Sequence, residues 1–353
     1  MDYGGADVCR SFPAAPRNFE GDDAFEFCHR CLRPIERRHT GLPLSPEVDE
    51  KMQIDRTSIP NLLFLSKGSR LLAILGAIFT IFAFLSASAR GEEIARGRYL
   101  VEALMACDNC HTPRGPDGYE MSLRFSGGSQ VFSEKDYTVR GSNISPDQHA
   151  GIGAWSDTQI RAAIIDGVGP TGRLAPVMPS ESYRALTPQD LQAIIDFLRA
   201  AVPVSASLPP QQKRGTLEPR PAIPGAEAPF TDADLSDRLK RGLYLASLAR
   251  CMSCHTGESG SAPDPRGRLG AGGKLFRTPA GVAVASNITS HPTKGVGAWT
   301  DEELKRAITH GIGRNGAPLA PTMANLSRAH FSKMTEEDVD ALVAWIRTLP
   351  PRE

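Results

Sequence analysis

The feature that most constrains this chain is a pair of C-x-x-C-H motifs, at residues 107–111 and 251–255. Two thiols at this spacing add across the two vinyl groups of one haem, and the adjacent histidine then reaches the iron. Zinc ribbons also use C-x-x-C, but they pair two such motifs at close spacing, whereas these lie 144 residues apart (251 − 107). The motifs therefore predict two covalently attached c-type haems, held through Cys107, Cys110, Cys251 and Cys254, with His111 and His255 as iron ligands.

An almost unbroken apolar run at 71–85 indicates export. It follows Lys67 and Arg70 and precedes an Ala-Ser-Ala tripeptide, an order that is typical of a secretory signal peptide. We therefore predict a signal peptide at 52–89 that is cleaved at its end. Because the run is short for a membrane span, retention of this segment as an anchor is the alternative.

Residues 1–51 precede that signal, although an export signal is read from the N-terminus of a chain. Met52 supplies a start shortly before the apolar run. We therefore expect residues 1–51 to lie upstream of the true start or to be disordered. The C-x-x-C at 28–31 is followed by Leu32 in place of histidine, so it is not expected to bind haem.

The rest of the chain repeats itself at the offset of the two motifs, which predicts two copies of one domain. The segments S-N-I-[ST], G-A-W-[ST]-D and G-[IV]-G begin at 142, 153 and 167 and again at 286, 297 and 311. Each copy has three segments with apolar residues at helical spacing. Capping residues open the second and third of these: Ser156, Thr187, Thr300 and Thr335. We predict an all-α fold with two tandem helical domains, 90–203 and 231–353, joined by a proline-rich linker at 204–230.

A second iron ligand is expected in each domain, because each histidine covers only one face of its iron. Met178 lies in L-A-P-V-M-P and Met323 lies in L-A-P-T-M-A, at corresponding points of the two copies. Methionine sulfur is a good axial ligand, and a proline-lined loop would hold it in place. We predict Met178 and Met323 as iron ligands, with gap filling as the alternative role. Met334 is a rival in the second domain, but it stands where the first has Leu186, which favours a core role.

Other recurring polar residues leave two readings open. Asn143 and Trp155 recur as Asn287 and Trp299, and their N–H groups suit either haem propionates or ordinary packing. Packing roles are expected for the tyrosines of the first helices, Tyr99 and Tyr244. Surface or loop positions are expected for the histidines that have no counterpart in the other copy, His149, His291, His310 and His330.

With these motifs placed, residues 91–350 resemble the multi-haem cytochrome c subunits of bacterial periplasmic dehydrogenases, such as those for alcohol and gluconate. The resemblance is carried by R-G-x-Y-L, C-x-x-C-H, S-N-I-[ST], G-A-W-[ST]-D and the P-x-M segment. It implies a cytochrome c fold around one covalently bound haem in each domain. It also implies electron transfer from a dehydrogenase subunit to quinone, an oxidase or another cytochrome. Those subunits usually carry three haems, whereas this chain has two motifs.

We therefore expect a periplasmic dihaem cytochrome c of a respiratory chain, which transfers electrons and is not itself an enzyme. Peripheral association with the inner membrane is left open. The alternative is a dihaem peroxidase-like oxidoreductase with one open iron, for which the second pocket is the candidate. The 40 Lys and Arg balance the 40 Asp and Glu, which argues against a nucleic-acid partner and for docking through apolar patches.

Overall fold

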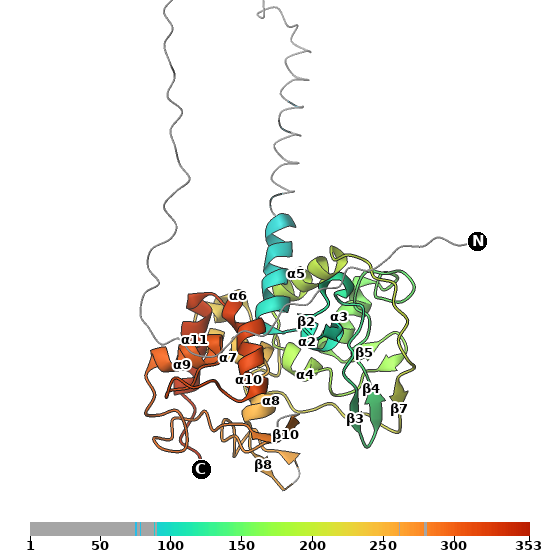
Figure 1. The fold of residues 1–353 in the computed structure, drawn as a ribbon. Coiled ribbons are helices and arrows are strands. Elements are labelled where there is room, and N and C mark those ends of the chain that lie inside the picture. Colours follow the sequence, from blue (N-terminus) through green and yellow to red (C-terminus); the bar gives the residue numbers. More distant parts are fainter. Residues whose placement is uncertain (1–74, 76–77, 79–87, 89, 261, 279–280) are drawn as a thin grey trace, which may run out of the picture. The chain divides into compact units, whose positions relative to one another are not determined.

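The computed structural model describes residues 75, 78, 88 and 90–353, apart from 261, 279 and 280 (Figure 1). The predicted upstream segment 1–51 and almost all of the predicted signal peptide 52–89 lie outside these residues. Among the helices of the described part, none combines the length and the apolar content needed to cross a bilayer. We call residues 90–203 the first half and residues 231–353 the second half. Both halves fall within one compact unit, Leu65–Glu353.

The first half begins with an α-helix over 90–99 that continues as the π-helix η1 (Leu100–Leu104). The elements that follow are α2 (Asp108–His111), β1 (Arg114–Gly115), β2 (Gly118–Tyr119), the 3-10 helix η2 (Met121–Leu123), β3 (Phe132–Glu134), β4 (Tyr137–Val139), α3 (Asp157–Ile165), β5 (Val168–Gly169), β6 (Gly172–Arg173), α4 (Ser180–Tyr183) and α5 (Pro188–Arg199).

The second half follows the short strand β7 (Gln212–Lys213). Its elements are α6 (Asp232–Leu235), α7 (Arg238–Leu248), α8 (Cys251–His255), β8 (Glu258–Ser259), β9 (Ala262–Pro263), β10 (Leu275–Thr278), β11 (Gly281–Val284), α9 (Asp301–His310), α10 (Pro321–Ala329), the 3-10 helix η3 (Phe331–Lys333) and α11 (Glu336–Arg347).

The prediction of an all-α fold is wrong. The structure is about 40% helix and 10% strand, and its described residues form five small antiparallel sheets. Several strands are only two residues long, such as β1 and β2. The turn between these two ends at Gly118, the first residue of β2, which has a positive φ of 120°. Hydrophobic periodicity cannot reveal strands of this length, because an alternating pattern needs four or more residues to be recognised.

The predicted helix caps are confirmed. The side chains of Ser156 and Thr300 accept from the backbone N–H groups three residues later and complete capping boxes for α3 and α9. The Thr187 and Thr335 side chains also accept from backbone N–H groups three residues later and cap α5 and α11. These caps satisfy backbone donors that have no partner within the helix, and they fix where each helix begins.

Glycine allows the first and last helices of each half to cross closely. A Cβ atom built on Gly97 would lie 1.9 Å from the Ala193 carbonyl oxygen, and one on Gly242 would lie 2.2 Å from the Ala341 oxygen. Neither distance leaves room for a side chain. The two crossings place the segment that enters each C-x-x-C-H motif against the last helix of the same half.

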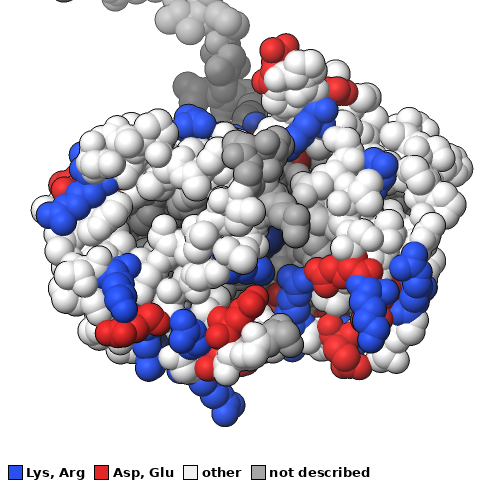
Figure 2. Space-filling view, turned by 60° about the horizontal axis from the view of Figure 1, so that its bottom comes forward, with Lys and Arg blue, Asp and Glu red and all other residues white. Residues whose placement is uncertain are grey.

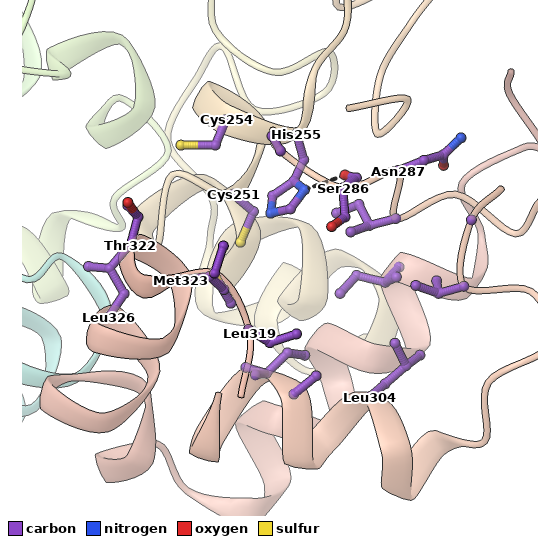
Figure 3. A pocket seen from close by; sticks show the side chains of 18 of the residues that line it. Cys251, Cys254, His255, Ser286, Asn287, Leu304, Leu319, Thr322, Met323 and Leu326 are labelled. Atoms are coloured by element: carbon purple, nitrogen blue, oxygen red, sulfur yellow. Dashed lines mark hydrogen bonds between the residues drawn. The ribbon is translucent and has the colours of Figure 1, made fainter. Parts of the chain in front are cut away.

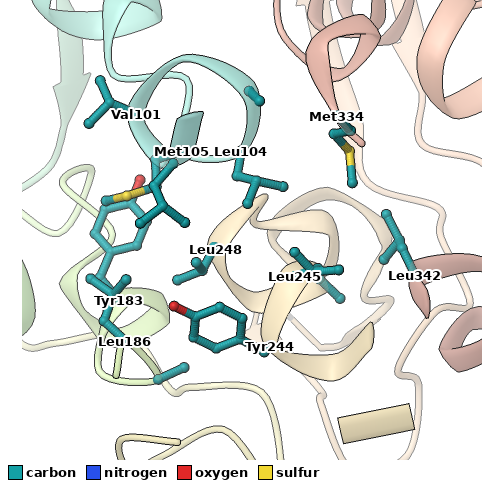
Figure 4. Close-up of a cluster of buried hydrophobic side chains, with 14 of the residues drawn as sticks. Val101, Leu104, Met105, Tyr183, Leu186, Tyr244, Leu245, Leu248, Met334 and Leu342 are labelled. Carbon is teal, nitrogen blue, oxygen red and sulfur yellow. The ribbon is translucent and has the colours of Figure 1, made fainter. Parts of the chain in front are cut away.

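The two halves share one hydrophobic core (Figure 4). Met105 and Leu104 come from the first half, and Leu248 and Met334 come from the second. Met334 is 9% exposed, which confirms its predicted core role. Because one core is built from both halves, neither half buries its apolar surface alone.

The tyrosines of the first helices form hydrogen bonds between the halves and are not confined to packing. The Tyr99 hydroxyl donates to the Asp338 carboxylate at 2.5 Å, and the Tyr244 hydroxyl donates to the Asp190 carboxylate at 2.5 Å. Arg96 of the first half also binds Asp190, through two contacts of 2.8 Å. Burial, followed by the hydrogen bond to Asp338, raises the pKa of Tyr99 to about 12.

His330 also joins the halves. It was predicted to lie at the surface or in a loop, and it lies in a turn but is not at the surface. Its side chain is 2% exposed. Nδ1 lies 2.8 Å from the Glu102 carbonyl oxygen, and Nε2 lies 2.7 Å from the Tyr119 hydroxyl. A carbonyl oxygen only accepts, so Nδ1 carries the proton and Tyr119 donates to Nε2.

The predicted linker 204–230 is packed against the protein. Within it, β7 pairs antiparallel with β4, and Ile223 and Phe230 are buried. The Phe230 N–H group donates to the Ala185 carbonyl at 3.0 Å. The linker therefore follows the protein surface, and its residues Ile223, Ala226 and Phe230 join the core that the two halves share.

Candidate functional site

A cavity of about 430 Å³ lies beside the second C-x-x-C-H motif (Figure 3). Its wall includes Cys251, Cys254 and His255 of α8 and Met323 of α10. Apolar residues of α9 and α11 complete much of the lining: Leu304, Ala307, Ile308, Leu342 and Ile346. This volume lies in the range of ligand and cofactor sites, and a mostly apolar wall suits a flat porphyrin. The residues present therefore fit a covalently bound haem.

His255 is held in one orientation by a backbone carbonyl. Its Nδ1 lies 2.7 Å from the Ser286 oxygen, and Figure 3 shows this contact as a dashed line. Because the carbonyl accepts, Nδ1 carries the proton and Nε2 keeps the lone pair that a metal needs. Burial lowers the pKa of His255 and favours the neutral ring, although the Ser286 hydrogen bond opposes that shift. A neutral imidazole is the form that ligates iron.

The first motif has the same arrangement. His111 Nδ1 lies 2.7 Å from the Ser142 carbonyl oxygen, and burial lowers the pKa of this ring as well. Ser142 and Ser286 occupy the same position in the S-N-I-[ST] segment of each half. In both halves, the Nδ1 contact therefore leaves Nε2 of the histidine as the nitrogen that can bind a metal.

The asparagines of these segments hold the orienting loops in place. Asn143 donates to the Val204 carbonyl at 2.8 Å, and its side-chain oxygen accepts from the backbone N–H and the hydroxyl of Ser145. Asn287 donates to the Arg352 carbonyl at 2.7 Å. Their amides are used within the protein, which favours the packing role over a contact with haem propionates. Trp299 lines the cavity of the second site.

The backbone before each motif turns through a left-handed residue. Ala106 has φ 51° and Arg250 has φ 58°, and each directly precedes the first cysteine of its motif. This turn separates the first helix of each half from the short helix at the motif, α2 or α8. This turn could not be predicted from residue type, because neither alanine nor arginine favours the left-handed region.

The four motif cysteines are each partly buried. Burial raises the pKa of Cys107 and of Cys251 to about 12. The described residues also contain no cluster of three or more His, Cys, Asp or Glu that could hold a metal ion.

The predicted methionines differ in their local structure. Met178 lies in a turn before α4, where its N–H group donates to the Ala175 carbonyl at 2.9 Å. The prediction that Met323 lies in a loop is wrong, because it is the third residue of α10. Its side chain lines the cavity with Cys251 and His255 (Figure 3). Proline at the first position of α10 starts the helix, because its missing N–H would have no partner there.

Comparison with known proteins agrees with this geometry. The cytochrome c family model matches residues 239–350. A dihaem cytochrome c-type protein of Cereibacter sphaeroides is 30% identical over 270 residues, which cover 74% of this chain and 87% of that protein. The cytochrome c subunit of the quinone-dependent alcohol dehydrogenase of Gluconacetobacter polyoxogenes is 38% identical over 120 residues, 34% of this chain and 23% of that subunit. The gluconate 2-dehydrogenase cytochrome c subunit of Pantoea cypripedii is 26% identical over 297 residues, 80% of this chain and 65% of that subunit.

The chain therefore spans about a quarter of the alcohol dehydrogenase subunit and about two thirds of the gluconate dehydrogenase subunit. The predicted resemblance to these cytochrome subunits is confirmed.

Proposed function

Because this chain belongs to the c-type cytochrome family, we propose that it is a dihaem protein that transfers electrons and does no bond chemistry of its own. The observation that carries the proposal is the matched pair of histidines. His111 and His255 each direct Nδ1 to a serine carbonyl at 2.7 Å and leave Nε2 for an iron. The corresponding segments at an offset of 144 residues (251 − 107) support one haem in each half.

The proposed ligands follow from this arrangement. Cys107 and Cys110 would attach one haem, and Cys251 and Cys254 would attach the other, each through two thioether bonds. Met178 and Met323 would take the remaining axial positions. When bound, the haem supplies one-electron chemistry, and methionine–histidine ligation raises its reduction potential. The chain's own contribution is to fix the imidazoles, to exclude water with apolar walls and to set the local charge.

The proposed partners follow from the relatives. Homologues are cytochrome subunits of dehydrogenase complexes, so we propose a dehydrogenase subunit as the electron donor. Quinone, an oxidase or another cytochrome would accept the electrons, and the periplasm would be the compartment, with the apolar run at 71–85 as the export signal. Acidic and basic side chains are interspersed on the face shown in Figure 2, which supports docking without strong electrostatic steering.

The proposal is tested by counting haems in the exported protein. Two variants, Cys107→Ser with Cys110→Ser and Cys251→Ser with Cys254→Ser, should each carry one haem where the unaltered chain carries two. Both haems should be low-spin when oxidised, as expected for two protein ligands. A count of one in the unaltered chain would contradict the dihaem proposal. A high-spin haem with peroxide turnover would support the peroxidase-like alternative instead.

A further inference from the structure

Arg250 is a cation placed at the second haem site without an equivalent at the first. It directly precedes Cys251, adopts the left-handed backbone conformation and lines the cavity beside that motif. The corresponding residue of the first half, Ala106, has the same backbone conformation and no charge. The charge is therefore a feature that distinguishes the second motif from the first.

The charge of Arg250 interacts with groups of both halves: the Tyr183 hydroxyl and the Cys110 thiol of the first, and the Cys254 thiol of the second. Helix α7, which leads into Arg250, packs on α4 of the first half, where the Ser247 hydroxyl donates to the Ser182 carbonyl at 2.9 Å. Arg250 thus stands between the two pairs of cysteines.

Among the residues that the structure describes, no ion pair within 4.0 Å includes Arg250. Its Nε atom is buried and has no hydrogen-bond partner among those residues. The acid that faces it is Glu181 of α4, which is 6% exposed and also faces Arg220 and Arg184. Burial raises the pKa of Glu181, although the three nearby arginines oppose that shift.

We propose that Arg250 is a fixed cation shared by the two haem sites and that it raises the reduction potential of both. This inference rests on the proposed function. An oxidised haem iron carries one more positive charge than a reduced one, so a neighbouring cation disfavours the oxidised state. The effect is large in a buried setting, because a low effective dielectric strengthens charge–charge interactions. A residue between the two cysteine pairs acts on both irons, whereas a residue inside one pocket would act mainly on one.

The test is a spectroelectrochemical titration of the exported holoprotein, with both midpoint potentials determined. Arg250→Gln should lower both, with at least a fivefold decrease in each equilibrium constant for reduction, or about 40 mV at 59 mV per tenfold change. Arg250→Lys keeps the charge and should change each constant less than twofold. Arg214→Gln removes an exposed cation of the linker and controls for net charge. Arg250→Met is a second neutral variant of similar length, in case the glutamine variant does not mature.

Three outcomes would overturn the inference. Potentials that do not move in either neutral variant would refute it, and so would a shift at one haem alone or a shift that Arg214→Gln reproduces. The failure of the proposed function is distinguishable, since the unaltered protein would then lack two covalent haems in the pyridine haemochrome spectrum. Two haems with unchanged potentials would refute only the role of Arg250.

Discussion

Replacing Tyr244 by phenylalanine tests whether the hydrogen bonds between the halves stabilise the protein. The change removes the 2.5 Å hydrogen bond to Asp190 and keeps the aromatic ring, which packs on Phe230 with centroids 5.6 Å apart. A hydrogen bond to a charged group contributes about 1.5–3 kcal/mol. Asp190 keeps both contacts to Arg96, so its carboxylate is not left unpaired. We therefore expect a loss near the lower end of that range, about 1.5–2 kcal/mol.

The loss is measured by thermal unfolding of the holoprotein, followed by far-UV circular dichroism. For a chain of this size, it corresponds to a decrease in Tm of roughly 2–4 °C. A double-mutant cycle with Asp190→Asn separates the Tyr244–Asp190 interaction from the other effects of each change. Tyr99→Phe removes the reciprocal hydrogen bond to Asp338 and should cost a similar amount. An interaction energy below about 0.5 kcal/mol in the cycle would refute the reasoning, since distant sites add to within that margin.

Three further predictions follow from single contacts. Gly242→Ala would place a Cβ 2.2 Å from the Ala341 oxygen, so we expect a loss of about 1–3 kcal/mol or more in unfolding free energy, measured by denaturant titration; an unchanged midpoint would contradict the close crossing. Burial lowers the pKa of His330, so the native state disfavours its protonation, and stability should fall as pH drops below about 6.5. His330→Gln should reduce this pH dependence, and an identical profile in the two proteins would exclude His330 as its source. Met323→Ala should lower the potential of the second haem and weaken the long-wavelength absorption band of methionine-ligated ferric haem; a spectrum identical to that of the unaltered protein would show that Met323 is not a ligand.

Much of the local structure was predictable from spacing alone. The caps of α3, α5, α9 and α11 and the apolar faces of the helices that follow them lie where the sequence placed them. Such features depend on residues three or four positions apart, and a helix brings those residues together whatever surrounds it. The core position of Met334 could be predicted from the repeat, because the corresponding residue of the first half is Leu186, an apolar residue that suits a buried position.

The strands and the position of Met323 were not predictable in this way. Two-residue strands such as β5 and β6 are too short for an alternating pattern. Met323 was expected in a loop because prolines surround Met178 in the first half, yet Ala324 replaces the second of these prolines and α10 continues through it. A single residue decides there between a turn and a helix, since proline removes a backbone donor and alanine favours the helix.

The sequence by itself determined the cofactor chemistry that the chain can support. Two cysteines and a histidine at fixed spacing define one attachment site, and this spacing holds in any fold that leaves the motif accessible. Tertiary structure alone decided which distant groups meet: the Ser286 carbonyl that orients His255, the Asp338 carboxylate that accepts from Tyr99, and the first-half groups with which Arg250 interacts. The physical reason is that periodicity records which face of a segment is buried, whereas the partner of a buried polar group is set by how remote segments pack.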